Sequence, residues 1–201
     1  MVLGVSLLGG VLLLSGAGPG PVGSMTAKGS GRGSMTATGS GMGSMTATGG
    51  GIGSMTWMTV DQAAGKLQQE KRPVLIDLYT TWCGWCREMD KKTYSNKRVE
   101  AYLEEKFYCV RVDAETRDVI SWLGRTYAYN PQYRSNEFAM YLTHGRLEFP
   151  TTIIITPGDA PQAIPGFMEP GEMEPVLKYF GEGAYKTQGF DEYLKNFKKS
   201  W

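Results

Sequence analysis

The sequence predicts an α/β domain in which helices cover a central mixed β-sheet, and three observations lead to this prediction. Residues 74–79 and 107–112 are largely apolar, residues 151–156 are β-branched throughout, and each run has the length of a strand buried in a sheet. Segments with helical periodicity lie between the first two runs and after the third. The motif Trp82-Cys83-Gly84-Trp85-Cys86 follows directly on the first run, where a helix should begin. This order of elements is typical of a sheet packed between helices.

The other elements follow from capping and helix-breaking residues. Ser95 is a suitable N-cap, Pro73 follows the end of the first helix, and Pro157 ends the third strand. We expect helices over 60–69, from the cysteine motif onward, over 95–103, over 172–180 and over 191–198. Gly181 would be the C-cap of the helix over 172–180. Residues 162–164 would form the hairpin partner of the third strand.

The composition of the chain changes sharply near Trp57. The 201 residues carry a net charge of +1, which argues against a nucleic-acid partner. Residues 1–57 hold 17 of the 27 glycines and only two charged residues, Lys28 and Arg32. A segment of this composition cannot bury enough apolar surface to offset its chain entropy. We therefore expect an apolar leader at 1–22, a flexible low-complexity segment at 23–57 and a folded domain at 58–201.

The leader resembles a signal peptide without basic residues at its start. Its apolar run over 2–14 is too short to span a bilayer as a lone helix, and the small residues at 15–17 resemble a cleavage site. We therefore expect a periplasmic or otherwise extracytoplasmic protein, with no membrane span in the mature chain. A cytoplasmic protein with a cloning-derived or mistranslated leader is the alternative.

The low-complexity segment repeats Gly-Ser-Met-Thr every ten residues, starting at Gly23, Gly33, Gly43 and Gly53. Such a unit offers no face that can pack, so a flexible tether or a cloning-derived sequence is expected. The repeated methionines, Met25, Met35, Met45 and Met55, are soft thioether ligands of the kind that bind Cu(I). No His or Cys lies beside them to complete a metal site, which favours the tether.

The cysteine motif carries redox chemistry. The first cysteine of a C-x-x-C motif at a helix start faces unpaired N–H groups and the positive end of the helix dipole, which favour its thiolate. The second lies one turn later, within reach of the first sulfur. Cys83 and Cys86 can therefore close a disulfide and open it again through a mixed disulfide. Trp82 and Trp85, beside the thiols, would exclude water and contact a partner.

These residues resemble those of the thioredoxin superfamily. Residues 74–86 match the family's active-site strand and turn, and Phe149-Pro150-Thr151 resembles its cis-proline loop. Gly166 matches the glycine that precedes the last helix of the family. More narrowly, residues 79–96 resemble exported thioredoxin-like proteins related to the C-terminal domain of the transmembrane disulfide-interchange reductase.

The resemblance implies a thioredoxin fold and an enzyme that reduces disulfides in exported proteins, with a role in cell redox homeostasis. It implies that Cys83 attacks the substrate, that Cys86 resolves the mixed disulfide and that Asp77 accepts the Cys86 proton. The residues expected to contact the substrate are Trp82, Gly84, Trp85, Phe149, Pro150 and Thr151. The expected partners are protein disulfides and a thiol protein that donates or accepts electrons. No metal and no cofactor beyond the Cys83–Cys86 disulfide are expected.

Two features depart from the family pattern. The position of the family's lysine, beside the buried aspartate, corresponds to Cys109, so we expect Asp77 to lack a cationic neighbour. The stretch between Asp113 and Pro150 is longer than in thioredoxin, and its extra part, about 122–147, is rich in aromatic residues. We expect an enlarged helical insertion before the cis-proline loop, which either packs a satellite core or forms a lid or partner surface.

Three alternatives to a reductase remain open. The same pair can act as a disulfide oxidase or isomerase, because the direction of electron flow is not written in the motif. The fold can also serve as a binding module in which the thiols are incidental. In the third alternative, Cys83, Cys86, Cys109 and His144 form a Cys₃His zinc site. Against it, Cys109 is expected to be an inert core residue and His144 to lie in a loop.

Overall fold

The structure is a computed structural model that describes residues 55–201. The expected leader at 1–22 lies outside the described residues, as does most of the repeat segment at 23–57, with Met25, Met35 and Met45. Within 55–201, none of the helices has both the length and the apolar character needed to cross a bilayer.

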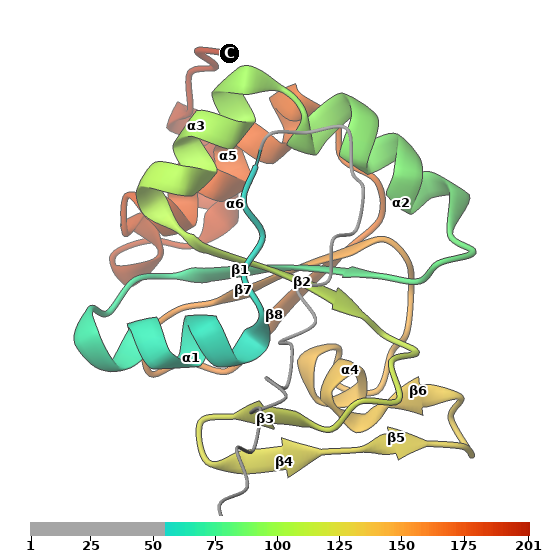
Figure 1. Cartoon of the computed structure of the whole chain (residues 1–201). Coiled ribbons are helices and arrows are strands. Elements are labelled where there is room, and N and C mark those ends of the chain that lie inside the picture. The colour runs from blue at the N-terminus through green and yellow to red at the C-terminus, as the bar shows by residue number, and fades with distance from the viewer. Residues whose placement is uncertain (1–54) are drawn as a thin grey trace, which may run out of the picture. The chain divides into compact units, whose positions relative to one another are not determined.

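A four-stranded mixed sheet forms the centre of the described domain (Figure 1). Its order is β2-β1-β7-β8, with β1 parallel to β2 and β7 antiparallel to both of its neighbours. The strands are β1 (Val74–Tyr79), β2 (Tyr108–Asp113), β7 (Thr151–Ile155) and β8 (Gln162–Pro165). The two central strands are buried along nearly their whole length because both of their faces are covered.

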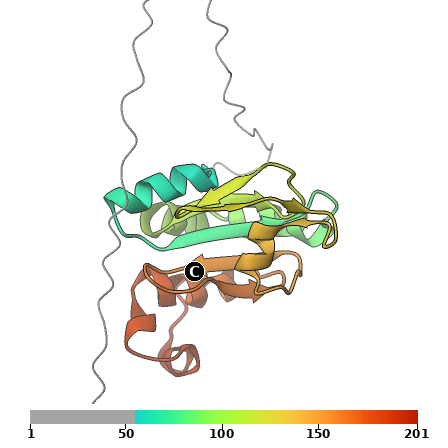
Figure 2. The ribbon, with the colours of Figure 1, turned by 90° about the horizontal axis from the view of Figure 1, so that it is seen from below.

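Helices cover both faces of the sheet. On one face, Leu75, Cys109 and Ile154 pack with α3 and α5, and on the other, Ile76, Val110 and Ile153 pack with α1 and α4. Figure 2 shows the C-terminal segment on the β8 side of the domain, opposite α1. The helices are α1 (Val60–Gln69), α2 (Gly84–Met89), the π-helical η1 (Asp90–Tyr94), α3 (Lys97–Lys106), α4 (Glu137–Leu142), α5 (Pro170–Gly181), the 3₁₀ turn η2 (Ala184–Lys186) and α6 (Phe190–Asn196).

Two helix caps differ from the expected ones. The N-cap of α3 is Asn96, whose side chain accepts from the backbone N–H groups of Arg98 and Val99. Ser95 is not the cap because η1 continues the cysteine helix to Tyr94 and the Ser95 hydroxyl donates to Asp90 O. Gly181 is the last residue of α5 rather than its cap, which is Glu182. Glycine fits there because a Cβ would lie 2.9 Å from the Tyr102 hydroxyl.

The segment before the cis-proline loop is not mainly helical, as the sequence analysis expected. It contains one helix, α4, preceded by two hairpins formed by β3 (Ile120–Trp122) with β4 (Arg125–Tyr127) and by β5 (Tyr129–Asn130) with β6 (Ser135–Asn136). The first hairpin turns at Leu123 and Gly124, both with positive φ, a geometry that matches the twist of paired strands.

Aromatic residues of this insertion pack into a core, as in one of the two expected roles, but this core is continuous with that of the sheet and is not a satellite. Phe138 of α4 lies at the centre, with ring centroids 6.0 Å from Trp122, 5.2 Å from Tyr127 and 6.2 Å from Tyr141. Trp122, Tyr127 and Phe138 are buried. The insertion is therefore joined to the main core and is not a detached lid.

The packed part of the chain includes residues ahead of Met58, where the sequence analysis placed the start of the domain. Met55 is buried, and Trp57 contacts Tyr94 edge to face with 5.0 Å between ring centroids. Met58 then pairs with Val110 as an isolated parallel bridge, and its N–H donates to Cys109 O. These contacts attach the segment to the β2 edge of the sheet.

A buried carboxylate on α5 holds residues 200–201. Glu174 is completely buried and accepts hydrogen bonds from Ser200 N at 2.8 Å, from the Ser200 hydroxyl at 2.7 Å and from Trp201 N at 3.3 Å. Lys178 forms an ion pair with it at 3.0 Å. Burial alone would raise the pKa of Glu174, but the hydrogen bonds from Ser200 and Lys178 outweigh it and hold that pKa below its ordinary value.

The substitution Glu174→Gln is expected to lower the free energy of unfolding by about 1–2 kcal/mol at pH 7, because charge-assisted hydrogen bonds are lost. Since the pKa is lower in the folded state, the contribution is present above the unfolded value, about 4.3, and is lost as the pH falls through the folded value. Urea unfolding at about pH 7 and pH 3 measures both the loss of stability and its dependence on pH. The exposed Glu192→Gln on α6 is the matched control, and an equal loss at both pH values would contradict the ionic role of Glu174.

Candidate active site

The cysteine pair is closed as a disulfide at the start of α2. Cys83 is the N-cap residue of that helix, and its Sγ accepts a hydrogen bond from Cys86 N at 3.0 Å. The Cys83–Cys86 disulfide joins Cα atoms 5.3 Å apart. The two residues are 4% and 3% exposed, so exposure does not distinguish them. The hydrogen bond from Cys86 N to Cys83 Sγ distinguishes them, because it stabilises a thiolate at position 83.

Two exposed indoles connect the cysteine turn to separate loops. Trp82 and Trp85 are each 62% exposed, far more than most large apolar side chains of the domain. The Trp82 ring contacts Phe149 edge to face at 5.9 Å, and Trp85 lies 5.7 Å from Phe167. Both indoles therefore present apolar surface to solvent beside the disulfide.

The expected cis-proline loop is present. The Phe149–Pro150 peptide bond is cis, and Pro150 directly precedes β7. Pro150 O accepts from Gly166 N at 2.8 Å, and the buried Thr151 hydroxyl donates to Glu148 O at 2.7 Å. Gly166 has a φ of 101°, which glycine adopts without strain, so the glycine at this position has a conformational reason.

Gly84, between the cysteines, is different. A Cβ there would meet only Arg87 Nη2, at an ordinary 3.8 Å, and its φ is not in the left-handed region. The fold therefore does not require glycine at position 84. A small residue there leaves the surface above the disulfide open.

Asp77 has a cationic neighbour, which corrects the expectation from sequence. In the parallel register, Asp77 lies opposite Arg111, whereas Cys109 lies opposite Leu75. Positions 109 and 111 point to the same face of β2 because side chains alternate along a strand. The cation therefore lies two residues after the position that the family resemblance gives for lysine. Arg111 Nε is 3.1 Å from Asp77 Oδ2, an ionic contact without hydrogen-bond geometry, and Arg111 Nη2 donates to Asp90.

The environment of Asp77 suits proton transfer near neutral pH. Its side chain is 2% exposed, and burial raises the pKa of Asp77 to about 7, although Arg111 opposes this effect. The nearby Asp90 carboxylate raises the pKa of Asp77 further. A carboxyl with this pKa populates both protonation states around neutrality and can accept or donate a proton.

Residues 56–136 match the profile of a family described as thioredoxin-like. The chain contains a thioredoxin-like domain. The sheet order, the disulfide at the start of α2 and the cis-proline loop agree with this assignment. The expected relationship to the disulfide-interchange reductase is also confirmed, because a segment of that protein matches this chain.

Two curated relatives are similar over short segments. The thiol:disulfide interchange protein DsbD of Ralstonia nicotianae is 39% identical over 46 residues, 23% of this chain. Spermatogenesis-associated protein 20 of Mus musculus is 29% identical over 66 residues, 33% of this chain. The matched segment is 8% of the length of each relative.

Solved thioredoxin-like structures are also similar. A thioredoxin-fold protein from Helicobacter pylori is 18% identical, with a TM-score of 0.49 covering 62% of this chain and 78% of that one. The oxidised C-terminal domain of DsbD from Neisseria meningitidis is 18% identical, with a TM-score of 0.41 covering 61% and 90%.

The thioredoxin-like domain does not assemble the Cys₃His zinc site. Cys109 lies in the core, where its Sγ is 3.8 Å from Leu103 O and burial raises the pKa of the thiol to about 12. His144 follows α4 and its Nε2 is bonded to Pro161 O at 2.9 Å. Among residues 55–201, no three His, Cys, Asp or Glu side chains lie together as metal ligands. Cys109 is thus an unreactive core residue.

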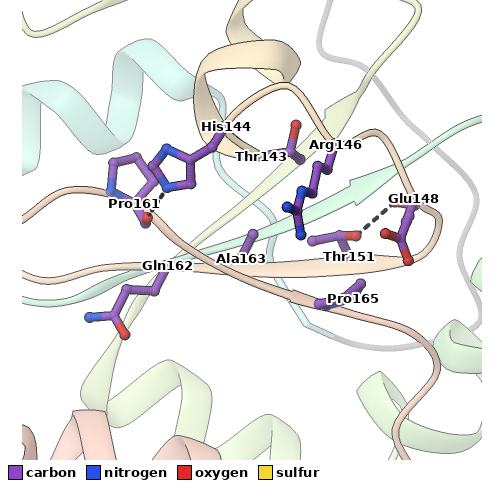
Figure 3. A pocket seen from close by; sticks show the side chains of 9 residues that line it. All are labelled: Thr143, His144, Arg146, Glu148, Thr151, Pro161, Gln162, Ala163 and Pro165. Carbon is purple, nitrogen blue, oxygen red and sulfur yellow. Dashed lines mark hydrogen bonds between the residues drawn. The ribbon is translucent and has the colours of Figure 1, made fainter.

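A hollow of about 540 Å³ adjoins the cis-proline loop. Figure 3 shows Arg146, from the loop between α4 and β7, extending toward Thr151 at the start of β7. The lining residues are Thr143, His144, Arg146, Glu148, Thr151, Pro161, Gln162, Ala163 and Pro165. Among the expected substrate residues, only Thr151 lies on this hollow.

Several residues of the site were not identified from the sequence. Arg111 and Asp90 surround Asp77, Glu115 accepts from the Trp82 indole at 3.0 Å, and Phe167 contacts Trp85. Each is a single charged or aromatic residue in an ordinary context, and only strand register and loop position bring it to the site. Of these, Arg111 alone carried a signal, as a charge inside an otherwise apolar run.

The substitution Asp77→Asn is expected to raise the free energy of unfolding by about 2–4 kcal/mol at pH 8 and to change it little at pH 4. The pKa of Asp77 is about 7 in the folded domain and about 3.9 in an unfolded chain. Stability from the protonated carboxyl is therefore fully present below about pH 4 and lost as the pH rises through about 7. Urea unfolding across this range measures the effect.

The control for this experiment is Asp61→Asn, on the exposed surface of α1. Its effect on the free energy of unfolding at pH 8 should be much smaller than that of Asp77→Asn. A stability difference between Asp77→Asn and the unsubstituted domain that does not vary with pH would mean that Asp77 is already ionised at pH 4 to 7.

Proposed function

We propose that this domain is a protein thiol-disulfide oxidoreductase that reduces disulfides in exported proteins. The observation that carries the proposal is the Cys83–Cys86 disulfide at the start of α2, in which the Cys86 N–H points at Cys83 Sγ. Asp77, buried at the end of the preceding strand and able to exchange a proton near neutral pH, supports it.

In the proposed reaction, the reduced domain transfers two electrons to its substrate. The Cys83 thiolate attacks one sulfur of a substrate disulfide, the substrate S–S bond breaks, and one substrate thiolate leaves. Asp77 accepts the Cys86 proton, and the Cys86 thiolate then attacks Cys83 Sγ in the mixed disulfide. The second substrate thiolate leaves and the Cys83–Cys86 disulfide forms. A thiol protein must then reduce the pair by the reverse steps.

The substrate would lie across the exposed surface around the disulfide. Trp82 and Trp85 provide apolar contact area, and the open position at Gly84 lets a chain approach the sulfurs. The Phe149–Pro150 turn before Thr151 would pair through its backbone with an extended substrate segment, as in strand addition. The signal-like leader at 1–22 supports an extracytoplasmic location for this chemistry.

The direction of net electron flow is tested by the redox potential of the Cys83–Cys86 pair. Equilibration with reduced and oxidised glutathione, followed by thiol alkylation and mass spectrometry, measures it. A reductase is expected to have a potential more negative than that of glutathione. A more positive potential would instead favour the alternative of an oxidase or isomerase. An absence of turnover of any protein disulfide would favour the binding module.

The substitution Cys86→Ser is expected to trap mixed disulfides with substrate, because Cys83 can still attack while resolution is lost. Non-reducing gel electrophoresis of the variant incubated with a disulfide-containing protein such as insulin shows the adducts. Cys83→Ser, which removes the attacking thiol, should give none, and Cys109→Ser should behave as the unsubstituted domain. Adducts formed by Cys83→Ser and not by Cys86→Ser would reverse the two roles.

A further inference from the structure

The Trp82 indole is held in one orientation although it is largely exposed. Its Nε1 donates to Glu115 Oε1 at 3.0 Å, and its ring edge meets Phe149 of the cis-proline loop. An exposed indole would otherwise sample several rotamers. The position of Glu115 therefore decides which surface Trp82 presents beside Cys83.

Glu115 lies in the loop that follows β2, and residues of the insertion hold this loop by its carbonyl groups. Asn136 N donates to Ala114 O at 2.7 Å, and the Ser135 hydroxyl donates to the same oxygen at 2.9 Å. The Asn136 Nδ2 donates to Thr116 O at 3.3 Å and to Asp118 O at 3.0 Å. Backbone carbonyls on both sides of Glu115 are thus bonded to Asn136.

The same Asn136 side chain begins α4. Its Oδ1 accepts from Phe138 N at 2.9 Å, as the N-cap of the helix, and the residue is fully buried. Capping requires only an acceptor, which Ser or Thr also supplies. The two amide donors of Asn136 are used for the Glu115 loop and not for the helix.

We propose that Asn136 is a positioning residue for substrate binding: it ties the insertion to the 114–118 loop so that Glu115 fixes Trp82 beside the disulfide. The role rests on the proposed function, in which Trp82 contacts substrate. It gives the insertion a part in recognition while its aromatic residues remain in the core. The chain of contacts runs from α4 through Asn136 and Glu115 to Trp82, and each link is a hydrogen bond or the loop itself.

The substitution Asn136→Ser separates the two roles, because serine keeps the cap acceptor and lacks the two amide donors. We expect the KM for a protein disulfide such as insulin to rise by about 3- to 10-fold, the factor that corresponds to ordering one freed side chain, that of Trp82, on binding. The kcat should stay within about 2-fold, because the disulfide and Asp77 are not in this network. The Trp82 indole N–H resonance in ¹⁵N-labelled protein, assigned with Trp82→Phe, should shift in the absence of substrate.

Glu115→Ala removes the last link without touching α4 and should raise KM by a similar factor. The double variant should be no worse than either single variant, because both act through the same contact. Asn96→Ser is the matched control: Asn96 also caps a helix, α3, through its side-chain oxygen. That variant should leave KM and the Trp82 resonance unchanged.

An Asn136→Ser variant that loses stability but keeps the KM and the Trp82 resonance of the unsubstituted domain would reduce Asn136 to a helix cap and overturn the proposal. If Asn136→Ser does not fold, Ser135→Ala removes another donor to the same loop and should shift the Trp82 resonance in the direction seen for Glu115→Ala. An unchanged Trp82 resonance in Ser135→Ala would then overturn the proposal that the insertion positions Trp82. The resonance is read without substrate, so a domain without reductase activity would overturn the proposed function separately.

Discussion

The parallel pairing of β1 with β2 places both the charged groups of the site and the 114–118 loop. This register sets Asp77 opposite Arg111, and the Ala114 N–H extends the pairing by donating to Tyr79 O. The first contact gives the buried carboxyl its cation, and the second directs the 114–118 loop toward the cysteine turn. Because side chains alternate along a strand, a shift of one residue would move Arg111 to the other face of the sheet and leave Asp77 without a counter-charge.

Burial is the main cause of the raised pKa of Asp77, and an imbalance among the ionised charges around it adds to this effect. One guanidinium, that of Arg111, serves two carboxylates, Asp77 and Asp90, and its hydrogen bond goes to the more exposed Asp90. Asp77 receives an ionic contact without a hydrogen bond, at a site where desolvation disfavours its charge. Protonation of Asp77 therefore removes both the desolvation cost of its buried charge and its repulsion by the Asp90 carboxylate. Arginine suits this arrangement because its planar fork reaches two acceptors, which the point charge of a lysine does less well.

Local pattern predicted most of the secondary structure, and long-range contacts account for what it missed. The apolar runs at β1 and β7 were recognisable because both faces of these strands are buried, and the C-x-x-C motif and the Phe149–Pro150 loop because their residues are adjacent in sequence. The prediction that Asp77 lacks a cationic neighbour was wrong, because strand register cannot be read from either strand alone. The hairpins of the insertion were missed because Leu123, a residue that rarely has positive φ, forms the turn with Gly124.

The proposed chemistry and the proposed recognition rest on different parts of the domain. Cys83, Cys86 and Asp77 are placed by β1 and the helix that follows it, and all three side chains are buried. The two indoles beside them are instead positioned from outside this unit, Trp82 by Glu115 and Phe149 and Trp85 by Phe167. These three partners come from loops after β2, before β7 and after β8. Under the proposed function, changes in these loops would alter which substrates fit without altering the thiol chemistry. Because the loop after β2 is bonded to the insertion through Asn136, the proposed role of Trp82 would also give the longer chain before the cis-proline loop a part in recognition.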